Sequence, residues 1–208
     1  MARASDQTTA ELLDRIRGGD EKATGELLGL FRPRLRRMVA ARMDDRVAAR
    51  VDPSDVVQEA LAAAHRRLPE YLNQVDSPSY PWLRQIAWDR LIDAHREHLH
   101  AKRRSVHKEM SMHLSEASSV CLAEQMAATG SGPSGHLIRR ELRGRIRAVL
   151  GELAELDREI LILKHLEELT NSECAAVLGI TVPAVKKRYL RALTRVRSLM
   201  DRESWRTK

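Results

Sequence analysis

The chain has 208 residues, enough for one large or two small domains that each bury a core. Aromatic residues make up only 3% of it, and the helix formers Ala, Leu, Arg and Glu dominate, without the alternating Val and Ile runs of a sheet. The composition therefore predicts an all-helical protein. The net charge of +7 favours a polyanionic partner such as nucleic acid.

The cysteines and the apolar runs narrow the class further. Cys121 and Cys174 are the only two cysteines and form no C-x-x-C pattern, which argues against a disulfide framework or a cysteine zinc site. No apolar run approaches the roughly 18 residues that a membrane span needs. The first residues lack the apolar segment of a signal peptide. We therefore expect a cytoplasmic protein with no membrane partner.

Four helices are predicted in the first half of the chain. The third opens at Asp52 and Pro53, where an acid supplies the N-cap and a proline fits the first helical position. The fourth opens with the same logic at Ser77 and Pro78 and ends in a polar, basic run. The first three helices are predicted at 11–17, 20–43 and 52–68. The fourth begins at 77–78 and ends in the basic run 95–104.

A change of composition separates this half from a second helical region. Residues 105–136 are rich in Ser, Met, Ala and Glu and finish in a Gly- and Ser-rich run, which is typical of a flexible linker. Four more helices are predicted at 137–150, 156–167, 171–178 and 183–200. The expected fold is thus two small helical domains, 1–104 and 137–208, joined by the linker 105–136.

The second domain contains the pattern of a helix-turn-helix. Thr170 and Glu173 form a capping box that starts a short helix. Ala175 is small enough for a close helix crossing, Gly179 permits a left-handed turn, and Val185 supplies an apolar plug from the next helix. A small residue, a turn glycine and a buried apolar residue at this spacing predict a helix-turn-helix. A plain helical hairpin with a basic face is the alternative.

The helix after this turn is strongly basic. Residues 181–208 hold nine Lys and Arg against two acids, a surplus equal to the net charge of the whole chain. Lys and Arg near the start of such a helix donate to guanine edges and to phosphates in the major groove. The candidate DNA-contacting residues are Lys186, Lys187, Arg188, Leu190 and Arg191.

Three segments together resemble one protein family. DPSDVVQEAL at 52–61 resembles the D-x-V-Q-E segment of bacterial sigma factors, and DSPSYPWLRQIAWDRLIDAH at 76–95 is similar to the segment that follows it. GITVPAVKKR at 179–188 is similar to the family's recognition helix. The segments occur in the family's order with no domain between them. The chain thus resembles the extracytoplasmic-function (ECF) group of sigma factors, which direct promoter-specific transcription initiation and are not enzymes.

The resemblance also implies partners. The first segment docks on the clamp coiled coil of the β′ subunit of core RNA polymerase, and the last domain binds the β flap and the minus-thirty-five promoter element. Promoter DNA and an anti-sigma protein are the other implied partners. The residues expected to dock on core polymerase are Asp55, Val56, Gln58 and Glu59.

The second segment is expected to capture the minus-ten element. Four of the seven aromatic residues lie between 71 and 88, and unpaired bases stack on aromatic rings. We expect this segment to supply the pocket for an unpaired base and the side chains that contact DNA phosphates. The minus-ten candidates are Asp76, Ser77, Ser79, Tyr80, Trp88, Asp89, Arg90, Asp93, Arg96, Lys102, Arg103 and Arg104. Trp82 is expected in the core.

Two other functions remain open from the sequence. A helix-turn-helix regulator that needs no polymerase would use the same second domain. Arg90 and His95 match the spacing of helical, metal-independent ribonucleases, although one such match is expected by chance. His95 and His98 share a helix face, but no carboxylate or Cys completes a metal set. No phosphate loop or nucleophile elbow occurs, so we predict no catalytic residue, metal or cofactor.

Overall fold

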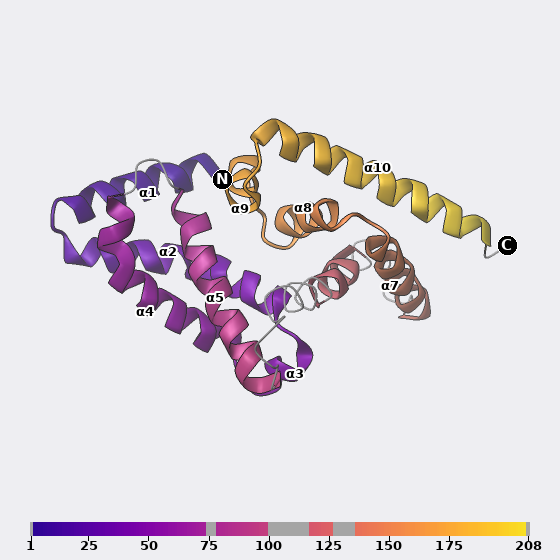
Figure 1. Ribbon diagram of the computed structural model, residues 1–208, viewed down its shortest axis with the longest axis horizontal. Coiled ribbons are helices and arrows are strands. Elements are labelled where there is room, and N and C mark those ends of the chain that lie inside the picture. Colours follow the sequence, from indigo (N-terminus) through magenta and orange to yellow (C-terminus); the bar gives the residue numbers. More distant parts are fainter. Residues whose placement is uncertain (1, 74–77, 100–116, 127–135, 207–208) are drawn as a thin grey trace. The chain divides into compact units, whose positions relative to one another are not determined.

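The computed structural model describes residues 2–73, 78–99, 117–126 and 136–206, and every regular element in these ranges is a helix (Figure 1). The chain divides into two compact units, Met1–Met110 and Ser111–Lys208. The predicted all-helical fold is confirmed.

A helical hairpin opens the first unit. It consists of α1 (Ala2–Arg17) and α2 (Glu21–Arg42), and Gly19 turns between them with a φ of 87°. Asp20 caps α2, and the Arg15 guanidinium pairs with the Asp20 carboxylate at 2.7 Å, which closes the hairpin. The start and end of α2 agree with the sequence prediction. α1 begins nine residues earlier than predicted, because its first turns are polar and carry no apolar periodicity.

Aspartate caps also set the next two helices. Asp44 caps α3 (Asp45–Ala48), a single turn that the sequence pattern did not reveal. Asp52 caps α4 (Pro53–Leu72) by accepting a hydrogen bond from the Ser54 backbone at 2.7 Å. The backbone and hydroxyl of Ser54 hold the pKa of Asp52 below its usual value. The predicted start of α4 is therefore correct, and the helix runs four residues further than expected.

The core of the first unit lies between three helices. α5 (Ser79–Leu99) packs against both α4 and α2, and α2 packs against α4 (Figure 1). Apolar residues at three- and four-residue steps place one face of each helix in this core. Large apolar side chains that are at most 1% exposed there include Leu27, Leu35, Met38, Val57, Leu83 and Leu91.

The second unit contains the helices α7 to α10. They are α7 (His136–Gly151), α8 (Glu155–His165), α9 (Asn171–Leu178) and α10 (Val182–Arg206). All four begin within one residue of their predicted starts. α10 packs against α7, α8 and α9, so the long C-terminal helix organises the unit.

The core of the second unit includes part of the expected linker. Residues 117–126 are helical, and Leu122 and Ala123 are buried in one cluster with Ile146, Leu150 and Ile162. The sequence composition suggested a linker because the segment is short and rich in Ala and Ser. The structure instead places 117–126 on the hydrophobic core of the second unit.

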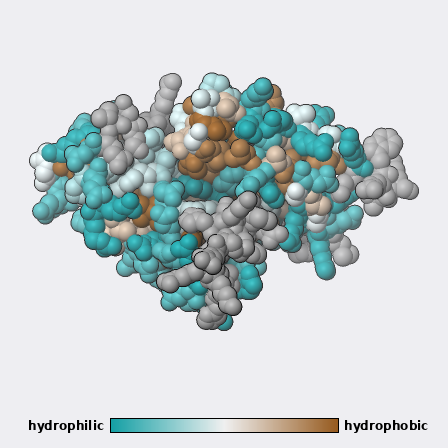
Figure 2. Space-filling model, viewed as in Figure 1, coloured by the Kyte–Doolittle hydropathy of each residue, from teal (hydrophilic) through white to brown (hydrophobic). Residues whose placement is uncertain are grey.

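The visible surface is mainly hydrophilic, with an apolar area over the second unit around α9 (Figure 2). Large apolar side chains that are at least 37% exposed include Leu156, Leu190 and Leu193 in this unit. Among the described helices, none is both long and apolar enough to cross a bilayer.

Candidate functional site

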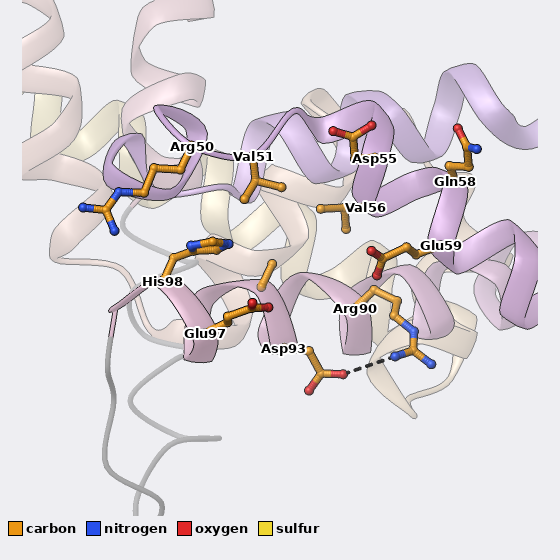
Figure 3. A pocket seen from close by; sticks show the side chains of 11 residues that line it. Arg50, Val51, Asp55, Val56, Gln58, Glu59, Arg90, Asp93, Glu97 and His98 are labelled. Atoms are coloured by element: carbon orange, nitrogen blue, oxygen red, sulfur yellow. Dashed lines mark ion pairs between the residues drawn. The ribbon is translucent and has the colours of Figure 1, made fainter.

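A groove lies between α4 and α5 of the first unit (Figure 3). Its volume is about 520 Å³. We call it the α4–α5 groove, and its lining residues are Arg50, Val51, Asp55, Val56, Gln58, Glu59, Arg90, Asp93, Ala94, Glu97 and His98. The four residues predicted to dock on polymerase therefore line a single concave surface. Asp55, Gln58 and Glu59 are exposed in it, whereas Val56 is only 3% exposed and forms part of its floor.

The charges of the α4–α5 groove are predominantly acidic. Asp55 and Glu59 come from α4, and Asp93 and Glu97 line the groove from α5, where the Asp93 side chain points toward Arg90 (Figure 3). Arg90 forms an ion pair with Asp93 across 3.6 Å on the surface of α5. These four carboxylates outnumber the two arginines that line the groove, so the groove suits a cationic partner.

The groove combines residues that the sequence analysis had assigned to two separate sites, the polymerase-docking site and the minus-ten site. Arg90 and Asp93 were grouped with the minus-ten residues, yet the structure brings them together with the docking residues of α4. Arg50, Glu97 and His98 were not predicted as site residues. Arg50 lies just before the D-x-V-Q-E segment but belongs to no motif, and Glu97 and His98 come from α5, far from that segment in the sequence.

The start of α5 is held against the end of α4. The Tyr71 hydroxyl and the Ser79 hydroxyl lie 2.9 Å apart and share a hydrogen bond, and Ser79 is buried. The Trp82 ring stacks on the Tyr71 ring with 4.2 Å between centroids. Burial raises the pKa of Tyr71, although the contact with Ser79 opposes the rise. Of the minus-ten candidates, Asp76 and Ser77 lie outside the described residues.

Tyr80 occupies an interior position. It is 2% exposed, its ring lies 6.0 Å from that of Phe31, and the Arg34 guanidinium covers it at 3.7 Å. The sequence placed Tyr80 among the residues that face single-stranded DNA. In this structure its ring faces the core of the first unit instead, because α2 contributes both Phe31 and Arg34 to cover it.

Trp88 is partly exposed on α5. Its ring lies 5.1 Å from the guanidinium of Arg42 and 5.3 Å from that of Arg84. Both arginines are buried, at 1% and 5% exposure, and the indole helps to stabilise their charges through cation–π contacts. Trp88 is thus a half-buried aromatic ring on α5 that lies beside two arginines.

The other minus-ten candidates on α5 are solvent-facing. Asp89 is exposed and accepts a hydrogen bond from Gln85 at 3.0 Å. Arg96 is exposed and lies 3.4 Å from Asp93. Lys102, Arg103 and Arg104 lie outside the described residues.

The helix-turn-helix has the predicted geometry. The Thr170 hydroxyl accepts from the Glu173 backbone at 3.2 Å, and the Glu173 carboxylate accepts from the Thr170 backbone at 2.8 Å. Gly179 ends α9 in the left-handed region with φ 63° and ψ 32°. Ala175 and Val185 are buried, at 9% and 0% exposure. The capping box, the turn and the apolar plug are all confirmed.

The first turns of α10 present basic and apolar side chains to solvent. Lys186 and Lys187 are exposed, and Leu190 is 67% exposed. On the opposite face, Val185 and Ala192 are completely buried. α10 therefore turns Lys186, Lys187 and Leu190 outward, and Val185 and Ala192 inward.

A carboxylate that the sequence analysis missed holds the other two candidates. Asp157, in the first turn of α8, accepts hydrogen bonds from Arg191 Nε at 2.8 Å and Nη2 at 2.7 Å, and from Arg188 Nη1 at 3.2 Å. Its side chain is only 8% exposed. The pKa of Asp157 is held below its usual value by the bonds from Arg191 and then Arg188, against the effect of burial. Asp157 and Arg191 are 34 residues apart, so no local pattern predicts the pair.

His95 has a structural role. It is fully buried; its Nδ1 donates to the Leu91 carbonyl at 2.8 Å, and its Nε2 accepts from the Asp44 backbone at 3.1 Å. Both ring nitrogens are thus occupied, and the ring joins α5 to the start of α3. The ribonuclease hypothesis requires an accessible histidine beside Arg90, and the burial of His95 contradicts it. Within the described ranges, no three His, Cys, Asp or Glu residues are placed together so that they could hold a metal ion.

One of the two helical units is built around a helix-turn-helix with a basic outer face, which is the architecture of a DNA-binding protein. The family model "Sigma-70, region 4" matches residues 143–196, which include the whole of α8 and α9. The chain is 31% identical to the ECF RNA polymerase sigma factor SigD of Mycobacterium bovis over 179 residues, 86% of this chain and 77% of that protein.

Two further relatives and one solved structure are also RNA polymerase sigma factors. The ECF RNA polymerase sigma-E factor of Escherichia coli K12 is 28% identical over 194 residues, 90% of this chain and 92% of that protein. The RNA polymerase sigma factor CnrH of Cupriavidus metallidurans is 29% identical over 153 residues, 74% of this chain and 75% of that protein. The solved structure of CnrH in complex with the cytosolic domain of CnrY has a TM-score of 0.53 at 23% identity and covers 93% of this chain and 97% of that chain. The chain belongs to the ECF sigma factors, and it directs transcription initiation by RNA polymerase.

Proposed function

We propose that the two units divide the work of initiation between them. The first, within 1–104, docks on core polymerase and captures the minus-ten element. The second, within 137–208, reads the minus-thirty-five element and binds the β flap. The connection 105–136 joins them, with 117–126 held on the core of the second unit. The observation that carries the proposal is the separation of an acidic groove in one unit from a basic recognition helix in the other.

Docking uses the α4–α5 groove. Asp55, Gln58 and Glu59 are exposed on its α4 wall, and the carboxylates of Asp93 and Glu97 line its α5 wall. Complementary charge across an interface guides encounter and fixes register, whereas like charges in contact cost several kcal/mol. We therefore assign the groove to the β′ clamp coiled coil, as a helical partner that carries basic side chains.

Capture of the minus-ten element falls to the start and the outer face of α5. Trp88 offers a partly exposed ring among basic groups, and Asp89 and Arg96 are exposed along the same helix. Stacking on such a ring is worth about 1–3 kcal/mol per base. Ser79 and Tyr80 support this surface from inside, since both are buried where α5 begins.

Recognition of the minus-thirty-five element falls to α10. Lys186, Lys187 and Leu190 project from its first turns. A helix held this way by a helix-turn-helix enters the major groove with its N-terminal residues at the base edges. Lysines there donate to guanine or phosphate, and an exposed leucine contacts a thymine methyl.

Regulation by a protein partner follows from the relatives. CnrH was solved in complex with the cytosolic domain of CnrY. We propose an anti-sigma partner for this chain as well, one that covers the α4–α5 groove and so prevents docking. The protein acts in the cytoplasm, where polymerase is, and it contributes binding and promoter opening without a catalytic residue or a cofactor of its own.

Reconstitution tests this proposal. The purified chain is added to sigma-free core polymerase with sheared DNA of the source genome, and the transcripts are sequenced. We expect 5′ ends that share two sequence elements upstream, and no such transcripts from core alone. A free-standing regulator would bind duplex DNA without core and give no transcripts, which would contradict the proposal.

A further inference from the structure

The recognition helix is tied to its own domain by one buried carboxylate. Asp157 accepts two parallel hydrogen bonds from the Nε and Nη2 edge of Arg191, and a third from Arg188. Two-point pairing of this kind fixes the plane and the direction of a guanidinium. The bond joins α8 to α10 at the part of α10 that carries the DNA-contacting residues.

The pairing divides the basic residues of α10 into two kinds. Arg188 and Arg191 are committed to Asp157, and 32% and 55% of their side chains are exposed. Lys186 and Lys187 are solvent-facing, as is Leu190. Asp157 occupies the Nε and Nη2 edge of Arg191, which is one of the two edges through which a guanidinium can pair with guanine at two points.

We propose that Asp157 is a positioning residue that determines promoter specificity. It sets the rotation of α10 and withholds the charges of Arg188 and Arg191 from the DNA backbone, so that Lys186, Lys187 and Leu190 make the discriminating contacts. This inference rests on the proposed use of α10 in DNA recognition. The sequence-based assignment of Arg191 as a direct base-reading residue is replaced by a supporting role.

The withheld charge makes a measurable difference in salt dependence. Each phosphate that a cation neutralises on duplex DNA adds about 0.9 to the slope of log affinity against log salt. Replacing the Asp157 carboxylate by an amide frees two guanidiniums beside the DNA. The slope on random duplex should then steepen by about 1–2.

The experiment uses the full-length chain and two labelled duplexes. One has random sequence, and the other is the tightest binder that the wild-type chain selects from a randomised library. Asp157→Asn is expected to bind the random duplex at least threefold more tightly at low salt and to lose about tenfold in discrimination between the two duplexes. Asp157→Glu keeps the carboxylate and should keep the wild-type salt slope.

Two control variants isolate the cause. Glu155→Gln removes one charge from the same turn of α8, at an exposed position, and should change the slope by less than half as much. Asp157→Asn combined with Arg191→Gln should return the slope toward that of the wild type. A purely structural role for Asp157 would lower thermal stability and leave the salt slope unchanged, and that result would overturn the inference.

Two further measurements keep the outcome decisive. Lys187→Ala must weaken binding to the selected duplex; if it does not, the assignment of α10 fails, independently of Asp157. If Asp157→Asn does not fold, as judged by circular dichroism, then Arg188→Gln with Arg191→Gln gives the reciprocal test. If Asp157 keeps the two arginines from the DNA, the double variant should bind the random duplex within about threefold of the wild-type affinity. A loss of tenfold or more would show that the arginines contact phosphates directly.

Discussion

The ring of Trp82 stacks on the ring of Tyr71, and the Tyr71 hydroxyl shares a hydrogen bond with Ser79. These contacts tie the end of α4 to the beginning of α5, the two helices whose walls form the α4–α5 groove. The position of α5 relative to α4 therefore depends in part on one buried hydroxyl pair.

A double-mutant cycle measures that pair. Tyr71→Phe and Ser79→Ala each remove the hydrogen bond between the two buried hydroxyls and should each cost about 1 kcal/mol. The double variant should cost less than the sum, with a coupling of about 0.5–1.5 kcal/mol. Urea unfolding followed by tryptophan fluorescence measures it, in a Trp205→Phe background so that Trp82 and Trp88 report the first unit. Strict additivity would show that the hydroxyls do not interact.

Alkaline pH gives a second test of the same residue. Burial raises the pKa of Tyr71 above its usual value, so the folded state favours the neutral phenol. This contribution to stability is fully present below about pH 10 and is lost as the pH rises through the folded-state pKa. The stability advantage of the wild type over Tyr71→Phe should stay constant up to about pH 10 and shrink as the pH rises further. Parallel stability curves for the two proteins would contradict the burial argument.

The turn of the helix-turn-helix should depend on glycine at one position. Gly179 has a φ of 63°, and beyond its chain neighbours a Cβ added there would meet no atom within 4 Å. Gly179→Ala should therefore cost about 1–2 kcal/mol from backbone strain alone. Gly179→Asn is the matched control, because asparagine tolerates the left-handed region. Hydrogen exchange of the α9 amides measures both; equal protection in the alanine variant and the wild type would refute the strain argument.

Charge reversal tests the docking groove. Asp55→Lys with Glu59→Lys places two cations on the α4 wall, and affinity for core polymerase should fall by about 100-fold or more, since like-charge contacts cost several kcal/mol. Glu70→Lys with Glu152→Lys makes the same change in net charge at exposed positions outside the groove. Binding to immobilised core, measured for both variants, should separate them. Similar losses in both would mean that net charge alone is responsible.

Much of the fold was predictable because its signals are local. Asp20, Asp52 and Thr170 are capping residues, and the helices that follow them begin where the sequence indicated. The turn at Gly179 was predictable for the same reason. α3 was missed because a single turn shows no periodicity, and the first turns of α1 were missed because they are polar.

The site was only partly predictable because its decisive contacts are distant in sequence. The docking residues follow one another on α4, but their partners across the groove, such as Glu97, come from α5. Asp157 looks like an ordinary acid in the first turn of a helix until α10 brings Arg191 to it. Tyr80 carries the aromatic signal of a base-stacking residue, and only packing against α2 reveals that it is buried.

The most direct test of the division between the two units compares open-complex formation on two templates. One is an intact promoter duplex, and the other has a pre-melted minus-ten bubble; permanganate footprinting reports the opening. Lys187→Ala should be impaired on both templates by a factor on the order of tenfold, because recruitment through α10 is still required. Trp88→Leu, which keeps apolar bulk without an aromatic face, should fail on the duplex and recover most of its activity on the bubble. If both variants fail equally on both templates, the proposed division of labour is wrong.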